Sequence, residues 1–96
     1  MDRLQVLIEA LRSGQYQQGT GYLCKDGKFC VLGVLCELHD IPFDGDSYHF
    51  DTPYRSSVPD WFLEQNGLSV EDGEVLISEN DEGTSFVELA SMLEQI

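Results

Sequence analysis

The 96-residue sequence predicts a small single domain, residues 1–96, of the α+β class, with about three or four helices and a short antiparallel sheet or hairpins. Two observations lead to this prediction. Apolar residues recur at helical spacing near both ends of the chain, and an Asp-Gly turn signal lies between two short apolar segments. A chain of this length can build one small hydrophobic core.

Helices are expected at both ends of the chain. The first should run from about residue 2 to residue 13 and stop at Gly14, because glycine readily adopts the left-handed conformation that ends a helix. The last should begin at Ser85, which with Glu88 has the spacing of a capping box. Their apolar stripes consist of Leu4, Leu7, Ile8 and Leu11 in the first helix, and of Phe86, Leu89, Ala90 and Leu93 in the last.

A hairpin and a buried helix are expected to follow the first helix. Lys25 to Lys28 contain the Asp-Gly pair that tolerates a tight turn between strands. The next apolar run, residues 31–38, is too continuous for a half-exposed strand and favours a central buried helix. Gly33 within it would let another backbone or side chain approach closely.

Residues 40–57 are expected to form a long acidic and aromatic excursion, and connections of this length in compact domains are often functional. Ser57 should then cap a short helix that carries Pro59 in its first turn and Trp61.

The segment after this helix predicts a strand. Glu71, Asp72 and Gly73 have turn composition, and the strand would run over Glu74–Ser78. Asn80 and Asp81 have two interpretations, either a turn before the last helix or a polar pair that approaches Cys30 across the core.

Charge is the strongest compositional signal. The chain has 18 acidic and 5 basic residues, for a net charge of −13. Residues 37–96 hold 15 of these acids against Arg55 alone, whereas the first 36 residues are nearly neutral. Because nucleic-acid backbones are bound by Lys and Arg, direct binding to nucleic acid is disfavoured. A basic protein partner is favoured instead, and proteins that handle nucleic acid are one such class.

The thiols offer a catalytic alternative. Cys30 is expected where a strand gives way to a helix N-terminus, where the helix dipole favours a thiolate. His39 or His49 would then serve as base, with Asp40 or Asp81 orienting the imidazole. The competing interpretation is that cysteines among Leu, Val and Phe are inert core residues.

The same thiols allow two further alternatives. A zinc site would use Cys24, Cys30, Cys36 and His39, which lack the paired C-x₂-C spacing typical of zinc ligands. Cys36 and His39 can meet on one helix face, whereas Cys30 and Cys36, six residues apart, point to different sides. A small-ligand pocket would instead involve Cys30, Cys36 and Asp81. The preferred prediction includes no metal and no cofactor, and since three cysteines leave one unpaired, reduced thiols are expected.

Four short motifs follow one another in a recognisable order. They are an N-terminal AL-SG-Y-Q-G pattern (Ala10, Leu11, Ser13, Gly14, Tyr16, Gln18, Gly19), FC-LGVLC, a helix with proline and tryptophan, and ND-G-SF-E-A. In this order the chain resembles a family of short proteins, largely of unassigned activity, encoded by phages, prophages and other bacterial mobile elements. The resemblance implies a biological context, the binding of host proteins, and it implies no particular reaction. Small acidic proteins of this kind often bind and disable a host factor, including defence nucleases, and some present carboxylates where nucleic acid presents phosphates.

Together, charge and resemblance predict a non-enzymatic binder of a basic host protein that acts by charge mimicry in the bacterial cytoplasm. No apolar run reaches the roughly 20 residues needed to span a membrane, and Asp2 and Glu9 interrupt the N-terminal segment, so neither a membrane span nor a signal peptide is expected. Aromatic anchors ringed by carboxylates would form the interface. The residues expected to form it are Asp44, Asp46, Tyr48, Phe50, Asp51, Tyr54, Trp61, Glu71, Asp72, Glu74, Glu79, Asp81 and Glu82.

Overall fold

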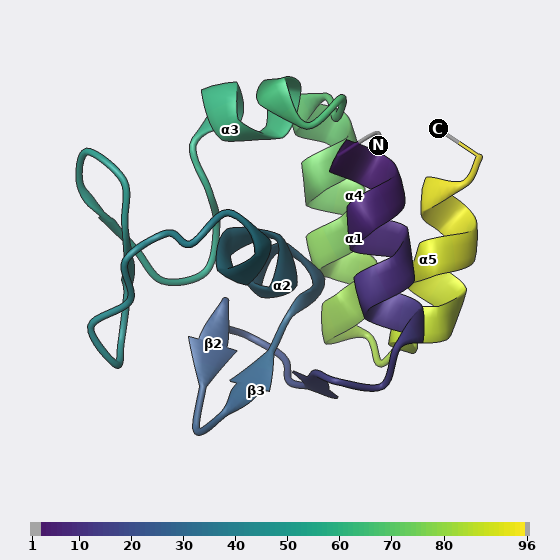
Figure 1. The fold of residues 1–96 in the computed structure, drawn as a ribbon, viewed down its shortest axis with the longest axis horizontal. Helices are drawn as coiled ribbons and strands as arrows, with labels where there is room; N and C mark the ends of the chain where they lie inside the picture. Colours follow the sequence, from purple (N-terminus) through teal and green to yellow (C-terminus); the bar gives the residue numbers. More distant parts are fainter. Residues whose placement is uncertain (1–2, 96) are drawn as a thin grey trace.

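The computed structural model describes residues 3–95 and confirms the α+β class (Figure 1). Within that range there are five helices and five two-residue strands. The helices are α1 (Arg3–Arg12), α2 (Val31–Leu38), α3 (Asp60–Gln65), α4 (Val70–Asp81) and α5 (Phe86–Leu93). The strands are β1 (Gln17–Gln18), β2 (Cys24–Lys25), β3 (Lys28–Phe29), β4 (Tyr48–His49) and β5 (Pro53–Tyr54).

Helix α2 lies at the centre of the fold, as predicted. Residues 31–36 are all buried, and α2 packs against α1 on one side and α4 on another. Helices α1 and α5 lie side by side, and α4 contacts α5 and α3 (Figure 1). Arg12 at the end of α1 forms an ion pair with Glu94, which follows α5.

Gly33 permits the closest packing in the core. A Cβ at this position would lie 1.8 Å from the carbonyl oxygen of Leu23, so no larger residue fits without moving backbone. The same carbonyl accepts a hydrogen bond from the Cys30 amide at 3.0 Å. The predicted close approach to α2 is therefore confirmed, and the approaching backbone belongs to the segment that leads into β2.

The predicted hairpin is also confirmed. Strands β2 and β3 pair antiparallel, with Asp26 and Gly27 in left-handed conformations at φ values of 54° and 77°. Strand β1 pairs parallel to β3, which gives a three-stranded sheet in the order β1-β3-β2. This small sheet lies below α2 in the view of Figure 1.

The predicted strand over Glu74–Ser78 is wrong, because this segment lies inside α4. Ser69 caps the helix: its hydroxyl accepts from the Asp72 amide, and the Asp72 carboxylate accepts from the Ser69 amide. Gly73 is therefore not a turn residue. A Cβ there would lie 2.7 Å from Leu63 Cδ1, so glycine allows α3 and α4 to pack closely.

The excursion over residues 40–57 extends away from α5 (Figure 1) and contains β4 and β5, which pair antiparallel. Tyr48 is fully buried, and its hydroxyl donates to Glu37 Oε2 at 2.8 Å. The Leu23 amide donates to the Arg55 carbonyl at 2.6 Å. These contacts fix both the middle and the end of the excursion to the body of the protein.

Candidate functional site

Cys30 stands where β3 gives way to the N-terminus of α2, as predicted. It is the N-cap residue of α2, and its sulfur accepts from the Gly33 amide at 3.4 Å. Its side chain is buried, with an exposed fraction of 3%. Burial raises the pKa of the Cys30 thiol to about 11, and the amide hydrogen bonds oppose this only in part. Desolvation therefore outweighs the helix dipole, and the thiol stays protonated at neutral pH.

The catalytic alternative lacks its base. His39 is the C-cap of α2, and its Nε2 lies 2.9 Å from Asn66 Oδ1. Nine residues separate it from Cys30 along one helix, which at 1.5 Å per residue is about 13 Å. The other histidine, His49, lies in the excursion and contacts Asp44.

Asp81 does approach Cys30. The two residues, together with Tyr22 and Ile77, line a hollow of about 290 Å³. The Asp81 carboxylate accepts from the Gly21 amide at 2.9 Å and thereby holds the segment before β2. Cys36 is fully buried and does not line this hollow, so the pocket expected around all three residues forms only in part.

All three cysteines are free thiols buried in the core. Burial raises the pKa of Cys24 and of Cys36, as it does for Cys30. Among residues 3–95, no three His, Cys, Asp or Glu side chains are grouped so that they could hold a metal ion. Cys24, Cys30, Cys36 and His39 are therefore not brought together as a ligand set.

Asn80 has a larger structural role than the sequence indicates. It is fully buried in the last turn of α4. Its Oδ1 accepts from the Val31 amide at 3.2 Å and from Gln18 Nε2 at 3.0 Å, and its Nδ2 donates to the Gly19 carbonyl at 2.8 Å. Asn80 thus satisfies an amide at the N-terminus of α2, next to Cys30, which agrees with the second of its two interpretations.

Gln18 extends this buried network to α5. Its Oε1 accepts from the Phe86 amide at 3.0 Å, and its Nε2 also donates to the Thr84 carbonyl at 2.6 Å. Two motifs whose residues Gln18 and Asn80 are 62 positions apart in the sequence therefore meet through these two side chains. These polar motif residues hold the fold together.

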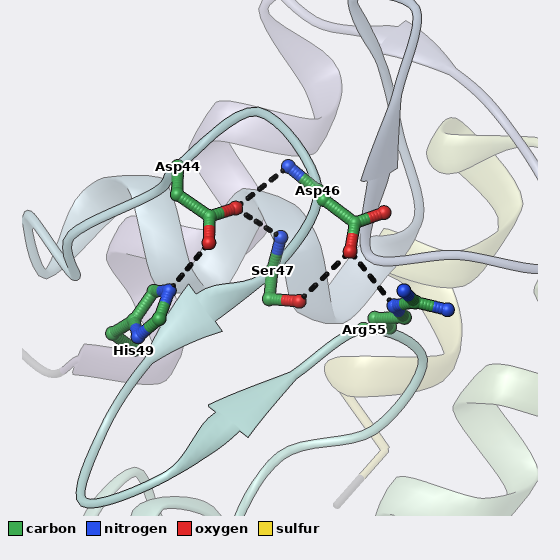
Figure 2. A network of polar contacts seen from close by, with 5 residues as sticks. All are labelled: Asp44, Asp46, Ser47, His49 and Arg55. Carbon is green, nitrogen blue, oxygen red and sulfur yellow. Dashed lines mark hydrogen bonds and ion pairs between the residues drawn. The ribbon is translucent and has the colours of Figure 1, made fainter.

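Two of the predicted binding carboxylates, Asp44 and Asp46, belong to a polar network within the excursion (Figure 2). Asp44 accepts from the amides of Asp46 and Ser47 at 2.9 and 2.8 Å, and its Oδ2 lies 2.6 Å from His49 Nε2. Asp46 Oδ2 accepts from Arg55 Nε at 2.8 Å and from the Ser47 hydroxyl at 3.3 Å. Both carboxylates therefore have partners within the loop that they help to fold.

The electrostatics of Asp44 reflect these contacts. The hydrogen bond from His49, followed by those from the Ser47 and Asp46 amides, lowers the pKa of Asp44 from 3.8 to about 2. The carboxylate is therefore charged throughout the neutral range, but its charge is largely directed at groups of its own loop.

The other predicted carboxylates divide into two groups. Asp72 caps α4, and Glu79 accepts from the Thr84 hydroxyl at 3.3 Å, as Asp81 does from the Gly21 amide. The second group is exposed and makes no hydrogen bond or ion pair with any residue that the structure describes. It consists of Asp51, Glu71, Glu74 and Glu82.

The predicted aromatic residues also differ in position. Tyr48 lies in the core and is not available at the surface, whereas Trp61 has an exposed fraction of 45%. Phe50 and Tyr54 are half-buried. The Phe50 ring packs edge-to-face against Tyr54 and Trp61, with ring centroids 5.6 and 5.7 Å apart.

Two further acids, not among the residues expected from the sequence, lie next to Trp61. Asp60 and Glu64 lie one turn apart on α3, next to Trp61, and both are exposed. Tyr54, Trp61 and these two carboxylates line an open hollow of about 640 Å³. The i, i+4 spacing of the two acids within the predicted tryptophan helix was the available signal.

A second, smaller hollow continues this surface onto α4. It has a volume of about 160 Å³, with Asp60, Val70 and Glu74 among its lining residues. Asp60 contributes to both hollows, so α3 and α4 present one continuous surface. We call this surface, together with the exposed Glu71 that follows Val70 on α4, the acidic face, and define it as Asp60, Trp61, Glu64, Val70, Glu71 and Glu74.

Comparison with known proteins identifies the family of the chain. Residues 4–72, from α1 to the start of α4, match a family described as a domain of unknown function, DUF8296. The chain belongs to this family. No curated protein and no solved structure matches it significantly. Membership of this family assigns no activity. No helix in residues 3–95 has the length and apolar character needed to cross a bilayer.

Proposed function

We propose that this protein binds a basic protein through the acidic face, and that it inhibits a host protein that handles nucleic acid by occupying its phosphate-binding surface. The proposal keeps the mechanism expected from the sequence, which is charge mimicry. It moves the centre of the interface from the loop carboxylates Asp44 and Asp46 to helices α3 and α4.

The charge of the acidic face supports this proposal most directly. Asp60, Glu64, Glu71 and Glu74 are exposed, and none of them forms an ion pair within the described part of the chain. Arg12 and Arg55 are paired elsewhere, with Glu94 and Asp46. A group of unneutralised carboxylates creates a negative potential that steers basic proteins towards it.

Apolar side chains lie among these carboxylates. Trp61 and Val70 are both exposed large hydrophobic residues, and tryptophan is the residue type most enriched among the side chains that dominate binding energy at interfaces. An apolar centre with a charged rim gives affinity as well as steering. Solubility alone would not account for an exposed tryptophan among these carboxylates.

The resemblance to small proteins of mobile elements supports the choice of target. Host enzymes that bind nucleic acid present Lys and Arg to phosphates, and carboxylates on a rigid helical surface can occupy those positions. The mobile-element origin and the bacterial cytoplasm as the site of action are parts of this proposal.

Affinity capture from bacterial lysate tests the proposal. The wild-type chain should retain a small set of basic proteins at low salt and lose them as the ionic strength rises, because the Debye length falls from about 10 Å at 0.1 M to about 3 Å at 1 M. Trp61→Ala should reduce capture at low salt. Retention of no basic protein, or retention insensitive to both salt and Trp61, would overturn the proposal.

A further inference from the structure

The hollow at α3 has a preorganised aromatic wall. Tyr54 and Trp61 both line it, and both pack edge-to-face against Phe50, which is half-buried behind them. Phe50 in turn contacts the buried Phe62 with ring centroids 4.9 Å apart. The two lining rings are therefore braced from the core, so little conformational entropy is lost when a ligand contacts them.

The same hollow also carries negative charge. Asp60 and Glu64 line it with exposed carboxylates, and no basic side chain is among its lining residues. Arg55, the residue after Tyr54, is held by Asp46 at 2.8 Å. Aromatic faces and unpaired carboxylates in one hollow form an environment for an organic cation, since the rings attract positive charge and the carboxylates accept hydrogen bonds from it.

We propose that this hollow binds an arginine side chain of the basic partner. The inference rests on the proposed function and identifies the group that is recognised. The guanidinium would stack on Trp61 or Tyr54 and donate hydrogen bonds to Asp60 and Glu64.

The chemistry of the hollow favours arginine over lysine. A guanidinium is planar, is more weakly hydrated than an ammonium, and can stack on an aromatic ring while its fork of N–H groups contacts carboxylates. An ammonium is a compact, strongly hydrated point charge that gains less from such a wall. A volume of about 640 Å³ is large enough for the whole side chain together with bound water.

Trp61 provides a direct reporter, because it is the only tryptophan in the chain. Its fluorescence should change saturably when a short peptide containing two arginines is added, with a Kd in the millimolar range or below. The matched lysine peptide has the same charge and should bind about threefold more weakly or worse. A citrulline peptide has nearly the same shape without the charge and should produce no saturable change.

Matched variants distinguish binding at the hollow from a general effect of the negative net charge. Glu64→Gln should weaken arginine-peptide binding several-fold, whereas Glu9→Gln removes the same charge from an exposed position on α1 and should leave binding nearly unchanged. Trp61→Ala should abolish binding measured by calorimetry. The control is Tyr22→Ala, which removes another exposed aromatic ring outside the hollow. Far-UV circular dichroism should be the same for all four variants, since each side chain is exposed.

The two proposals fail in different ways. Equal binding of arginine and lysine peptides, or binding that Trp61→Ala leaves intact, would overturn the arginine hollow. Salt-sensitive capture of basic proteins would survive that result and keep the proposed function. If no arginine peptide binds at all, the hollow is likewise contradicted, and capture again decides the proposed function separately.

Discussion

Asn80 shows how a single buried polar side chain can hold several elements together. Its amide group makes hydrogen bonds to Val31, Gly19 and Gln18, which belong to the start of α2 and to the segment of β1. From the sequence, a position of Asn80 near Cys30 is one of two alternatives. The network could not be foreseen, because its partners, two backbone groups and the Gln18 side-chain amide, lie 49 to 62 residues away in the sequence.

Replacing Asn80 by alanine should destabilise the protein strongly. The change removes the partner of the buried Val31 amide and of the half-buried Gly19 carbonyl, and an unpaired buried group costs about 1–3 kcal/mol. Urea denaturation should therefore show a free energy of unfolding lower by roughly 3 kcal/mol or more. Ser78→Ala, on the exposed side of the same helix, is the control. A loss for Asn80→Ala as small as that of the control would contradict the role assigned to Asn80.

The thiols should be inert in the native state. Because burial raises the pKa of Cys30 to about 11, the thiolate fraction at pH 7 is on the order of 10⁻⁴. A thiol reagent at neutral pH should modify the folded protein far more slowly than the same chain in urea. Native labelling faster than that of free cysteine, abolished by Cys30→Ser, would restore the catalytic alternative.

At the scale of the elements, Gly33 in α2 and Gly73 in α4 differ in the kind of atom that lies next to them. A Cβ at Gly33 would meet a backbone carbonyl, whereas a Cβ at Gly73 would meet the terminal methyl groups of Leu63. A side-chain methyl can rotate away, but the backbone of Leu23 is tied to Cys30 and Arg55 by hydrogen bonds.

Replacement by alanine should destabilise the protein strongly at Gly33 and only slightly at Gly73. Both changes gain about 1 kcal/mol of helix propensity. Gly33→Ala should nevertheless unfold the protein or lower its stability by several kcal/mol, because the clash is with backbone. Gly73→Ala should be tolerated to within about 1 kcal/mol after Leu63 readjusts. Thermal denaturation of both variants tests this, and equal effects would contradict the packing described here.

The excursion network gives a pH dependence. Because the pKa of Asp44 is lowered from 3.8 to about 2, its contribution to stability is fully present above the ordinary pKa and is lost as pH falls towards 2. In NMR, the side-chain carboxyl carbon of Asp44 should titrate near pH 2. His49→Ala removes the hydrogen bond that is the largest cause of the shift, so the midpoint should rise. The same midpoint in both proteins would show that His49 does not hold Asp44.

The elements that could be predicted are those with strong local signals. The apolar stripe of α1, the Asp-Gly turn between β2 and β3 and the continuous apolar run of α2 all agree with the structure. Helix α4 was not predicted, because Gly73 was interpreted as a turn residue. The capping box expected for Ser85 and Glu88 forms only in part, with the Ser85 hydroxyl accepting from the Glu88 amide at 3.2 Å, while a complete one forms at Ser69.

At the scale of the whole molecule, the sequence predicted the sign of the surface charge but not its arrangement. Four of the carboxylates expected to bind a partner protein instead form hydrogen bonds within the chain. They are Asp44, Asp46, Asp72 and Asp81. Asp60 and Glu64 were overlooked although they flank Trp61. The partners of Asp44 and Asp72 are local, in a turn and a helix cap, whereas Gly21, the partner of Asp81, lies 60 residues away, so only the folded structure shows which carboxylates stay free.

The central claim is that the position of the acids, rather than their number, creates the binding surface. The most direct test compares two double variants of equal net charge in their association with a captured basic partner, measured by stopped flow. Glu71→Gln with Glu74→Gln alters the acidic face, and Glu9→Gln with Glu88→Gln alters exposed positions on α1 and α5. Since steering charges act on the encounter rate, the first pair should slow association about tenfold at low salt and the second should leave it nearly unchanged. Equal slowing by both pairs would contradict the claim and leave only a general effect of net charge.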